Sequence, residues 1–354
     1  MRSAFAGPLC AGMVMAFVAG VCRAAEPGFA PVEMRATPIS AFRIGETGDR
    51  FGALEFRGGL ALWSRDRRFG SWSGLDFGAD GQTLYAVSDK GFWFSARVIE
   101  EAGHLVGIAD AKLAPMLDER GQALADKDQS DAEGLRIAWR DGVETALVSF
   151  EQVTEVRTYA AAPDFALARS GHVALPFFAR RLHDNQGLEA IAVAPAESRL
   201  GGAVVVIAEH SLNADRNHRA FVLDGPLVGA FAIRRVGDFD LTDAAFLADG
   251  DLLVLERRFS LSNGVGMRIR RIPGGVVAPG ATVDGVVLIE ADLGYQIDNM
   301  EGLSVRVTGE GETTIDLISD DNQNPLQRTL LLQFVLPSEP PPPRPGAAVG
   351  RPPR

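Results

Sequence analysis

Carboxylate side chains recur at two positions of a pattern that the sequence repeats five times. Each repeat opens on a small or acidic residue followed by Gly or Ala and an aliphatic residue, and it ends in an apolar run closed by a carboxylate. The opening residues are Ser73, Glu133, Glu189, Asp243 and Glu301, which lie 60, 56, 54 and 58 residues apart. The closing carboxylates are Asp89, Glu151, Glu209, Glu256 and Asp320. Acids at such even spacing are expected at equivalent positions of a repeated fold.

Carboxylates gathered from several repeats would form a cation site. The opening acids would make one ring and the closing acids a second ring or rim. Such close carboxylates repel one another unless they protonate or a cation neutralises them. Calcium takes six to eight oxygen ligands in flexible geometry, whereas magnesium prefers fewer carboxylates and more water. Asp321 and Asn322 add further oxygens after Asp320. The alternative is architectural, with the acids bonding backbone N–H groups at corners of the fold.

Short β-strands must position these acids. The apolar runs are five or six residues long and rich in Val, Leu and Ile, as buried strands are. Asp-Gly pairs at positions 80, 141 and 249 are typical of hairpin turns. A repeat of about 55 residues with about four antiparallel strands is typical of a propeller blade. We therefore predict an all-β chain that forms a β-propeller of five or six four-stranded blades around a central channel. The residues before the first repeat and after the last would pair to close the ring. A β-sandwich with similar strands is the alternative.

Two end segments are predicted to lie outside this fold. Residues 1–25 have the positive start, apolar stretch and small-residue exit of a secretory signal peptide, with a membrane anchor as the alternative. This predicts a periplasmic or secreted protein without stable membrane insertion after cleavage. Residues 338–354 are rich in proline and are expected to form an extended tail, which leaves 26–337 as the folded domain. Both cysteines, Cys10 and Cys22, lie in the signal segment, so the mature chain would have no disulfide or thiolate site.

The charge of the chain excludes some partners. The formal net charge is −11, and each end segment carries +2, so residues 26–337 carry −15. Such an acidic surface repels nucleic acid. We therefore expect a small-molecule ligand, and a monomer.

Other hydrolase signatures are missing from the sequence. It contains no Gly-x-Ser-x-Gly elbow, no His-Glu-x-x-His zinc motif and no phosphate-binding P-loop. The five histidines lack ligand spacing, although His183 precedes an opening acid. Arg257 and Arg258 follow a closing acid directly, and arginine binds phosphate in a bidentate manner. Arg257, Arg258 and His183 are therefore the candidate substrate-binding residues.

Nine segments, taken together, resemble the bacterial phytase-like family, whose domain is described as having esterase-like activity of phytase. They are Arg57-Gly-Gly-Leu-Ala-Leu62, Ser88-Asp-Lys-Gly91, Asp131-Ala-Glu-Gly-Leu135, Val148-Ser-Phe-Glu151, Asn185-Gln-Gly-Leu-Glu189, Leu252-Leu-Val-Leu-Glu-Arg-Arg-Phe-Ser260, Asp298-Asn-Met-Glu-Gly302, Ser319-Asp-Asp-Asn322 and Gln327-Arg-Thr-Leu-Leu-Leu332. The resemblance implies a propeller, favours six blades, and implies phosphoesterase activity. It places functional acids at Asp89, Glu133, Glu151, Glu189, Glu256, Glu301, Asp320 and Asp321. Gln152 and Gln323 stand where the family pattern leads us to expect Arg and an aromatic residue.

The leading hypothesis is an exported metal-dependent hydrolase, a phytase-like phosphoesterase in which Ca²⁺ activates water. The candidate metal ligands are Asp89, Glu133, Glu189, Glu209, Asp243, Glu256, Glu301, Asp320 and Asp321. Glu151 and Glu189 are the candidate catalytic residues, either of which would accept the proton of the water. The alternatives are a metal-dependent lactonase or carboxylic esterase, and a non-catalytic ligand-binding propeller.

Overall fold

The computed structural model describes residues 27–124, 126–179, 187–260 and 264–338. The predicted signal segment lies outside the described residues, as does the predicted tail from residue 339 onwards. Strands make up nearly all of the regular structure. In the described part of the chain, no helix is long and apolar enough to cross a membrane.

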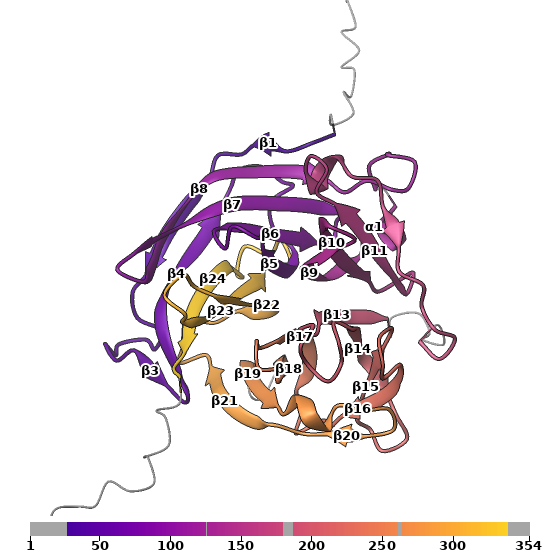
Figure 1. Ribbon diagram of the computed structural model, residues 1–354. Helices are drawn as coiled ribbons and strands as arrows, with labels where there is room; N and C mark the ends of the chain where they lie inside the picture. Colours follow the sequence, from indigo (N-terminus) through magenta and orange to yellow (C-terminus); the bar gives the residue numbers. More distant parts are fainter. Residues whose placement is uncertain (1–26, 125, 180–186, 261–263, 339–354) are drawn as a thin grey trace, which may run out of the picture.

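Five β-sheets are arranged in a ring, as the blades of a β-propeller (Figure 1). The innermost strands of blades 1 to 5 are β5 (Trp72–Phe77), β9 (Ala132–Arg140), β13 (Leu188–Val193), β17 (Asp240–Phe246) and β22 (Asn299–Val307). Each of them contacts the innermost strands of both neighbouring blades, and β22 contacts β5. The predicted all-β propeller is thus confirmed, and it has five blades rather than the six that the family resemblance favoured.

The other strands follow outwards from the channel in each blade. Blade 1 adds β6 (Thr83–Ser88), β7 (Phe92–Glu101), β8 (His104–Pro115) and β1 (Ala30–Pro31). Blade 2 adds β10 (Val143–Phe150), β11 (Glu155–Ala160) and β12 (Gly171–His172). Blade 3 adds β14 (Val204–Leu212), β15 (His218–Val222), β16 (Gly229–Ile233) and β20 (Thr282–Val283). Blade 4 adds β18 (Leu252–Ser260), β19 (Gly264–Ile272) and β21 (Val286–Asp292). Blade 5 adds β23 (Thr313–Asp320), β24 (Thr329–Leu336), β4 (Leu54–Trp63) and β2 (Arg35–Ile39), with β3 (Arg50–Phe51) paired to β4. Three short helical turns are α1 (Lys127–Ser130), η1 (Phe165–Leu167) and η2 (Gly274–Val276).

Strands from opposite ends of the chain close the ring in blade 5. Strand β4 pairs antiparallel with β24, with Leu60 opposite Leu331. Figure 1 shows the purple β4 beside the yellow β24. The predicted closure is confirmed, and it explains the blade number, because the two end segments complete the fifth blade together instead of adding a sixth.

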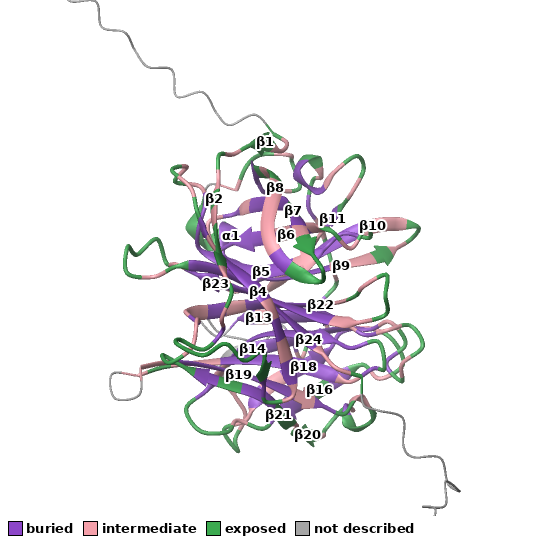
Figure 2. Ribbon diagram, turned by 90° about the vertical axis from the view of Figure 1, so that its left-hand side faces the viewer, coloured by how far each residue is buried: buried purple, intermediate pink, exposed green. Residues whose placement is uncertain are grey.

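Apolar side chains form five core clusters, one at each junction between neighbouring blades. At the junction of blades 5 and 1, for example, Leu60 of β4 packs in one cluster with Trp72 and Leu75 of β5. Figure 2 shows buried residues along the strands and exposed residues in the connections. Because each cluster is shared by two blades, no blade buries its apolar faces alone.

Arg136 lies across the channel and joins the blades from inside. Its guanidinium donates to the backbone carbonyl oxygens of Leu75, Leu135, Ala244 and Leu303, which belong to the innermost strands of four blades. It also lies 2.9 Å from the carboxylate of Asp243. Both side chains are buried. Because Arg136 contacts the innermost strands of four blades, the ion pair lies near the axis of the ring.

We expect Arg136→Met to lower the free energy of unfolding by about 3–5 kcal/mol, because it leaves the Asp243 carboxylate buried without its countercharge. Urea denaturation would measure the loss. Arg271→Met is the matched control, since Arg271 pairs with Asp249 and Asp251 at 2.6 and 2.7 Å in a partly exposed site. Partly exposed pairs contribute at most about 1 kcal/mol. Equal losses in the two variants would contradict the role given to Arg136.

Candidate active site

A β-bulge lies near the start of every innermost strand. In blade 1, Trp72 pairs with Ser88 and Gly74 with Val87, which leaves Ser73 as the extra residue. The same irregularity makes Glu133, Glu189, Thr242 and Glu301 the bulge residues of the other blades. A bulge redirects the side chain of its extra residue. Four of the five bulge residues, all except Thr242, line one cavity.

The glycine after a bulge residue lets neighbouring blades come close. A Cβ atom at Gly134 would lie 2.8 Å from the carbonyl oxygen of Glu189 and 2.9 Å from the amide nitrogen of Ile191, closer than real Cβ contacts. The N–H of Gly134 donates to Ser149 Oγ, and Ser149 Oγ donates to the carbonyl oxygen of Glu189, both at 2.9 Å. The Glu-Gly pair of the repeat therefore has two functions: the acid faces the cavity, and the glycine permits contact between blades.

The cavity at this end of the channel has a volume of about 830 Å³. Eight carboxylates line it: Asp89, Asp131, Glu133, Glu151, Glu189, Asp298, Glu301 and Asp320. Among the described lining residues, Arg257 is the one basic side chain. It donates to Asn299 Oδ1 at 2.8 Å, and its Nε lies 3.2 Å from Glu301 Oε2. The cavity is strongly acidic, with one cation fixed on its wall.

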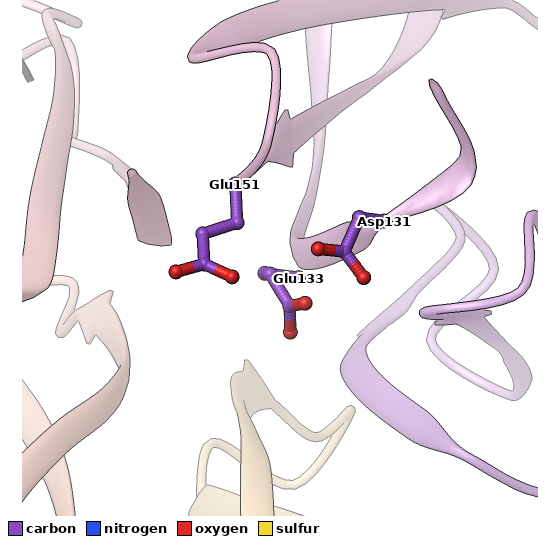
Figure 3. Close-up of side chains that lie close together, drawn as sticks. All are labelled: Asp131, Glu133 and Glu151. Atoms are coloured by element: carbon purple, nitrogen blue, oxygen red, sulfur yellow. The ribbon is translucent and has the colours of Figure 1, made fainter. Parts of the chain in front are cut away.

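Asp131, Glu133 and Glu151 form the tightest group in the cavity. Each offers a carboxylate oxygen within 4.8 Å of the others, and Figure 3 shows the three side chains converging. The N–H of Glu151 donates to the carbonyl oxygen of Asp131 at 3.1 Å, where β9 and β10 meet. This bond holds the two acids side by side, and the bulge brings Glu133 between them. Such a carboxylate trio could bind a metal ion, because its oxygens are ligands that hard cations prefer.

The acids of the cavity carry perturbed pKa values. Burial raises the pKa of Glu133 well above its usual range, and the charges of Asp131, Glu301 and Glu151 raise it further. Burial likewise raises the pKa of Asp131 and that of Asp89, although Lys90 partly offsets the rise for Asp89. The pKa of Asp320 rises to about 7, first through burial and then through the charges of Asp89 and Asp321. Protonation or a bound cation would relieve this repulsion.

Most of the acids predicted from the repeat reach the cavity. Asp89, Glu133, Glu151, Glu189, Glu301 and Asp320 line it, as does Arg257. The cavity therefore holds both candidate catalytic acids and five of the nine predicted metal ligands, with Glu189 counted in both groups.

Blade 4 departs from the predicted alignment of the repeats by one residue. Its bulge residue is Thr242 rather than Asp243. In the other blades the closing acid follows the residue that is paired just before the bulge. In blade 4 that residue is Glu256, paired with Leu241, so Arg257 takes the position of the closing acid. A shift of one residue turns a strand side chain to the other face. Asp243 instead pairs with Arg136 and accepts the N–H of Leu303 at 2.7 Å.

Glu256 is enclosed by arginines inside blade 4. Its carboxylate oxygens lie 2.8 Å from Arg268 Nε and 2.6 Å from Arg270 Nη2, and all three side chains are buried. The structure thus places two predicted metal ligands, Asp243 and Glu256, outside the cavity lining and in structural ion pairs.

Asp321 also faces away from the cavity lining. Its carboxylate accepts the N–H of Ser71 at 3.1 Å and the hydroxyl of Thr329 at 3.1 Å. The next-but-one residue, Gln323, donates to the carbonyl oxygen of Arg67 at 2.8 Å. Asp321 and Gln323 therefore join the β23–β24 connection to the start of blade 1, which is the architectural role that the sequence left open.

Arg258, a predicted substrate-binding residue, does not line the described cavity. The guanidinium of Arg258 lies over the ring of Phe239, 4.8 Å from its centroid, and 3.8 Å from Asp238. It points away because it alternates with Arg257 along β18. His183 lies outside the described residues, and so does the side chain of Glu209.

Two acids of the cavity, Asp131 and Asp298, were not among the predicted site residues. Asp131 stands two residues before Glu133, and this Asp-x-Glu spacing was the available signal, since alternate strand residues face the same way. Asp298 accepts the backbone N–H groups of Asn299 and Arg328, each at 3.0 Å. Asp298 therefore also fixes the connection between β23 and β24.

We expect the metal-free protein to lose stability as the pH rises from about 4 to 7. The pKa of Asp320 is about 7 in the folded protein and about 3.9 in an unfolded chain. The folded state therefore binds the extra proton in this window, and folding becomes less favourable as that proton is lost. In the wild type, the N–H of Asn322 donates to Asp320 Oδ1 at 2.6 Å. Asp320→Asn keeps an oxygen that can accept this bond. In excess EDTA at pH 8 it should be more stable than the wild type by at least about 1 kcal/mol, the free energy of one pKa unit.

Urea titrations of both proteins at pH 4 and pH 8 would test this. The difference should be small at pH 4, where the carboxyl is protonated in the folded protein and still about half protonated in the unfolded chain. A wild-type stability that rises between these pH values, or a variant that is less stable at pH 8, would contradict the assignment.

Comparisons with known proteins give a family and two distant structures. Residues 67–323 match the phytase-like family, described as "Esterase-like activity of phytase". No curated protein shows significant similarity. An endo-arabinase from Bacteroides thetaiotaomicron is 9% identical, with a TM-score of 0.45 over 75% of this chain and 93% of that one. A gluconolactonase from Xanthomonas campestris is 13% identical, with a TM-score of 0.37 over 88% of this chain and 100% of that one. The resemblance noted in the sequence is confirmed by the family match: this chain belongs to the phytase-like family.

Proposed function

We propose that this protein is an exported, Ca²⁺-dependent hydrolase of phosphoesters. The observation that carries the proposal is the trio of Asp131, Glu133 and Glu151, whose oxygens lie within 4.8 Å of one another. Burial and mutual repulsion raise the pKa of Glu133 well above its usual range. A divalent cation would remove this repulsion. The family description supports an esterase-like activity, and the apolar, small-residue character of residues 1–25 supports export.

The donor set fits calcium better than magnesium. Three carboxylates converge, and Asp89 and Glu301 line the same cavity. Calcium accepts many carboxylate oxygens in variable geometry, whereas magnesium retains several waters in a strict octahedron. When bound, the ion would offset the charge of a phosphate group and lower the pKa of a water molecule.

We propose Glu189 as the proton acceptor of this site. It is the bulge residue of blade 3 and lines the cavity next to blade 2 without belonging to the tight trio. A carboxylate that does not hold the metal is the better general base. We therefore assign Glu133, Asp131 and Glu151 to metal binding and Glu189 to proton transfer.

Arg257 would orient the phosphate group. Its contacts with Asn299 and Glu301 fix the guanidinium at the cavity wall. A planar guanidinium binds phosphate oxygens in a bidentate manner. The surrounding acids repel an anion, so we expect phosphate to bind only after the cation.

The metal site is tested by a thermal melt in excess EDTA followed by a Ca²⁺ titration. We expect a saturable rise in the melting midpoint, with about 2.7 kcal/mol of added stability at 100 times the dissociation constant. Glu133→Gln should remove most of this rise. Glu310→Gln is the matched control, because Glu310 is exposed and does not line the cavity.

If the melting midpoint does not change at millimolar Ca²⁺, after bound metal has verifiably been stripped, the proposed mechanism is refuted. The acids would then be architectural, and the non-catalytic binding propeller would become the better hypothesis.

The reaction is tested with phosphomonoesters and lactones in parallel. We expect phosphoester hydrolysis that collapses in EDTA and returns with Ca²⁺. Glu189→Gln should lower kcat by about 10²–10⁴-fold, the usual contribution of a general base, while the Ca²⁺-dependent rise in the melting midpoint is retained. Undiminished turnover in EDTA would contradict the mechanism. Lactone hydrolysis without phosphoester hydrolysis would select the lactonase or carboxylic esterase instead.

A further inference from the structure

Apolar side chains gather on one part of the wall of the acidic cavity. Phe259, Leu293 and Leu326 line the cavity although they are 72%, 61% and 89% exposed. Beneath them, Ile297 belongs to the core cluster between blades 4 and 5, and Val265 packs against that cluster. We call Phe259, Leu293 and Leu326 the apolar lip. Large apolar side chains that border a polar cavity are typical of a ligand-binding surface.

The apolar lip lies across the ring from the carboxylate trio. Phe259 is on β18 of blade 4, Leu293 follows β21 of the same blade, and Leu326 lies between β23 and β24 of blade 5. The trio belongs to blade 2, whose neighbours in the ring are blades 1 and 3. The cavity therefore has a metal-binding side and an apolar side.

Arg257 joins the two sides of the cavity. It stands two residues before Phe259 on β18, so both side chains leave the same face of the strand. A phosphate group held by Arg257 would thus have the ring of Phe259 beside it. The substituent of that phosphate would extend along the apolar lip.

The lip is held in place by the surrounding structure. The connection that carries Leu326 is fixed by a bond from the N–H of Leu326 to Asn324 Oδ1 at 3.0 Å. Arg328 fixes its far end by donating its N–H to Asp298 at 3.0 Å and its guanidinium to Gln296 at 2.9 Å. Leu293 packs against the start of β19, where a Cβ at Gly264 would lie 2.8 Å from Leu293 Cδ1. The backbone that carries Leu326 and the side chain of Leu293 are therefore held by their neighbours, which lowers the entropic cost of binding a ligand there.

We propose that the substrate is a phosphomonoester with an apolar alkyl or aryl group, selected by the apolar lip. This rests on the proposed function, since it places the phosphate at the metal site. Of the described residues that line the cavity, eight are acids and one is basic. A compact polyanion would meet more repulsion than one cation and Arg257 can offset, and it would leave the lip in water.

The test measures binding of alkylphosphonates with two to eight carbons to the Ca²⁺-loaded protein by calorimetry. These ligands are not hydrolysed, so the result does not depend on activity. A fully buried methylene favours binding by a factor of about four. We expect the octyl ligand to bind at least about tenfold more tightly than the ethyl ligand, because its extra methylenes contact the lip. The gain is smaller than full burial would give, since only part of the longer chain reaches the lip.

Substitutions in the lip should reduce this selectivity. Leu326→Gln and Leu293→Gln should each lower the octyl-to-ethyl affinity ratio by about threefold or more, since they remove apolar contact area. Leu167→Gln is the matched control, because Leu167 is 42% exposed and does not line the cavity. It should keep the wild-type ratio.

Two outcomes separate this proposal from the proposed function. Chain-length-dependent binding without hydrolysis of any phosphomonoester would leave the lip established and refute the phosphoesterase. Equal affinity for the two phosphonates, or hydrolysis of ethyl and octyl phosphate with equal kcat/KM, would overturn the role of the lip alone. Absence of any phosphonate binding would refute both proposals. A ratio unchanged by both leucine substitutions would overturn the role of the lip as well.

Discussion

Repulsion between buried carboxylates is the interaction around which one end of the channel is organised. Unlike a salt bridge, it opposes folding, so the backbone must hold the acids together by other means. The bulges of the innermost strands aim Glu133, Glu189 and Glu301 inward, and the glycine after Glu133 lets blades 2 and 3 touch. Five shared core clusters and the Arg136 contacts supply the favourable free energy on which this arrangement depends.

The asymmetry of the ring gives the cavity its chemistry. Five identical blades would produce a symmetric circle of acids with no preferred place for an anion. Blade 4 breaks the pattern, because Thr242 replaces an acid at the bulge and Arg257 replaces one at the strand end. The cavity consequently has acids from blades 1, 2, 3 and 5, and a fixed cation from blade 4. An anionic group and a metal ion can then be held at different points of one site.

The sequence was sufficient to predict the propeller, its closure and most acids of the cavity, because all three depend on even spacing of strands and side chains. It could not decide the blade number. End segments of this length can either complete one blade together or form an additional blade. It also could not decide the register of blade 4. Asp243-Ala-Ala resembles the Glu-Gly-Leu motif of other repeats in sequence. In the structure, however, Asp243 pairs with Leu255, so the extra residue of the bulge is Thr242. The same limit applies to Asp321, because spacing alone does not say whether a carboxylate faces a cavity or a backbone N–H group.

The placement of Arg136 shows how the acids and the channel depend on each other. Its guanidinium neutralises Asp243, which the shift in blade 4 turned away from the cavity, and it binds carbonyl oxygens of four innermost strands. Burial still raises the pKa of Asp243 to about 7, so even a paired acid here is costly. In the cavity, Glu301 lies 3.2 Å from Arg257 Nε and Asp298 lies 3.8 Å from Arg328 Nε, and both arginines are partly exposed. A protein that keeps so many carboxylates together at neutral pH gains stability from any cation that binds them, because binding to the folded state alone favours folding. Cation binding and the integrity of the ring are therefore expected to be coupled through the same side chains.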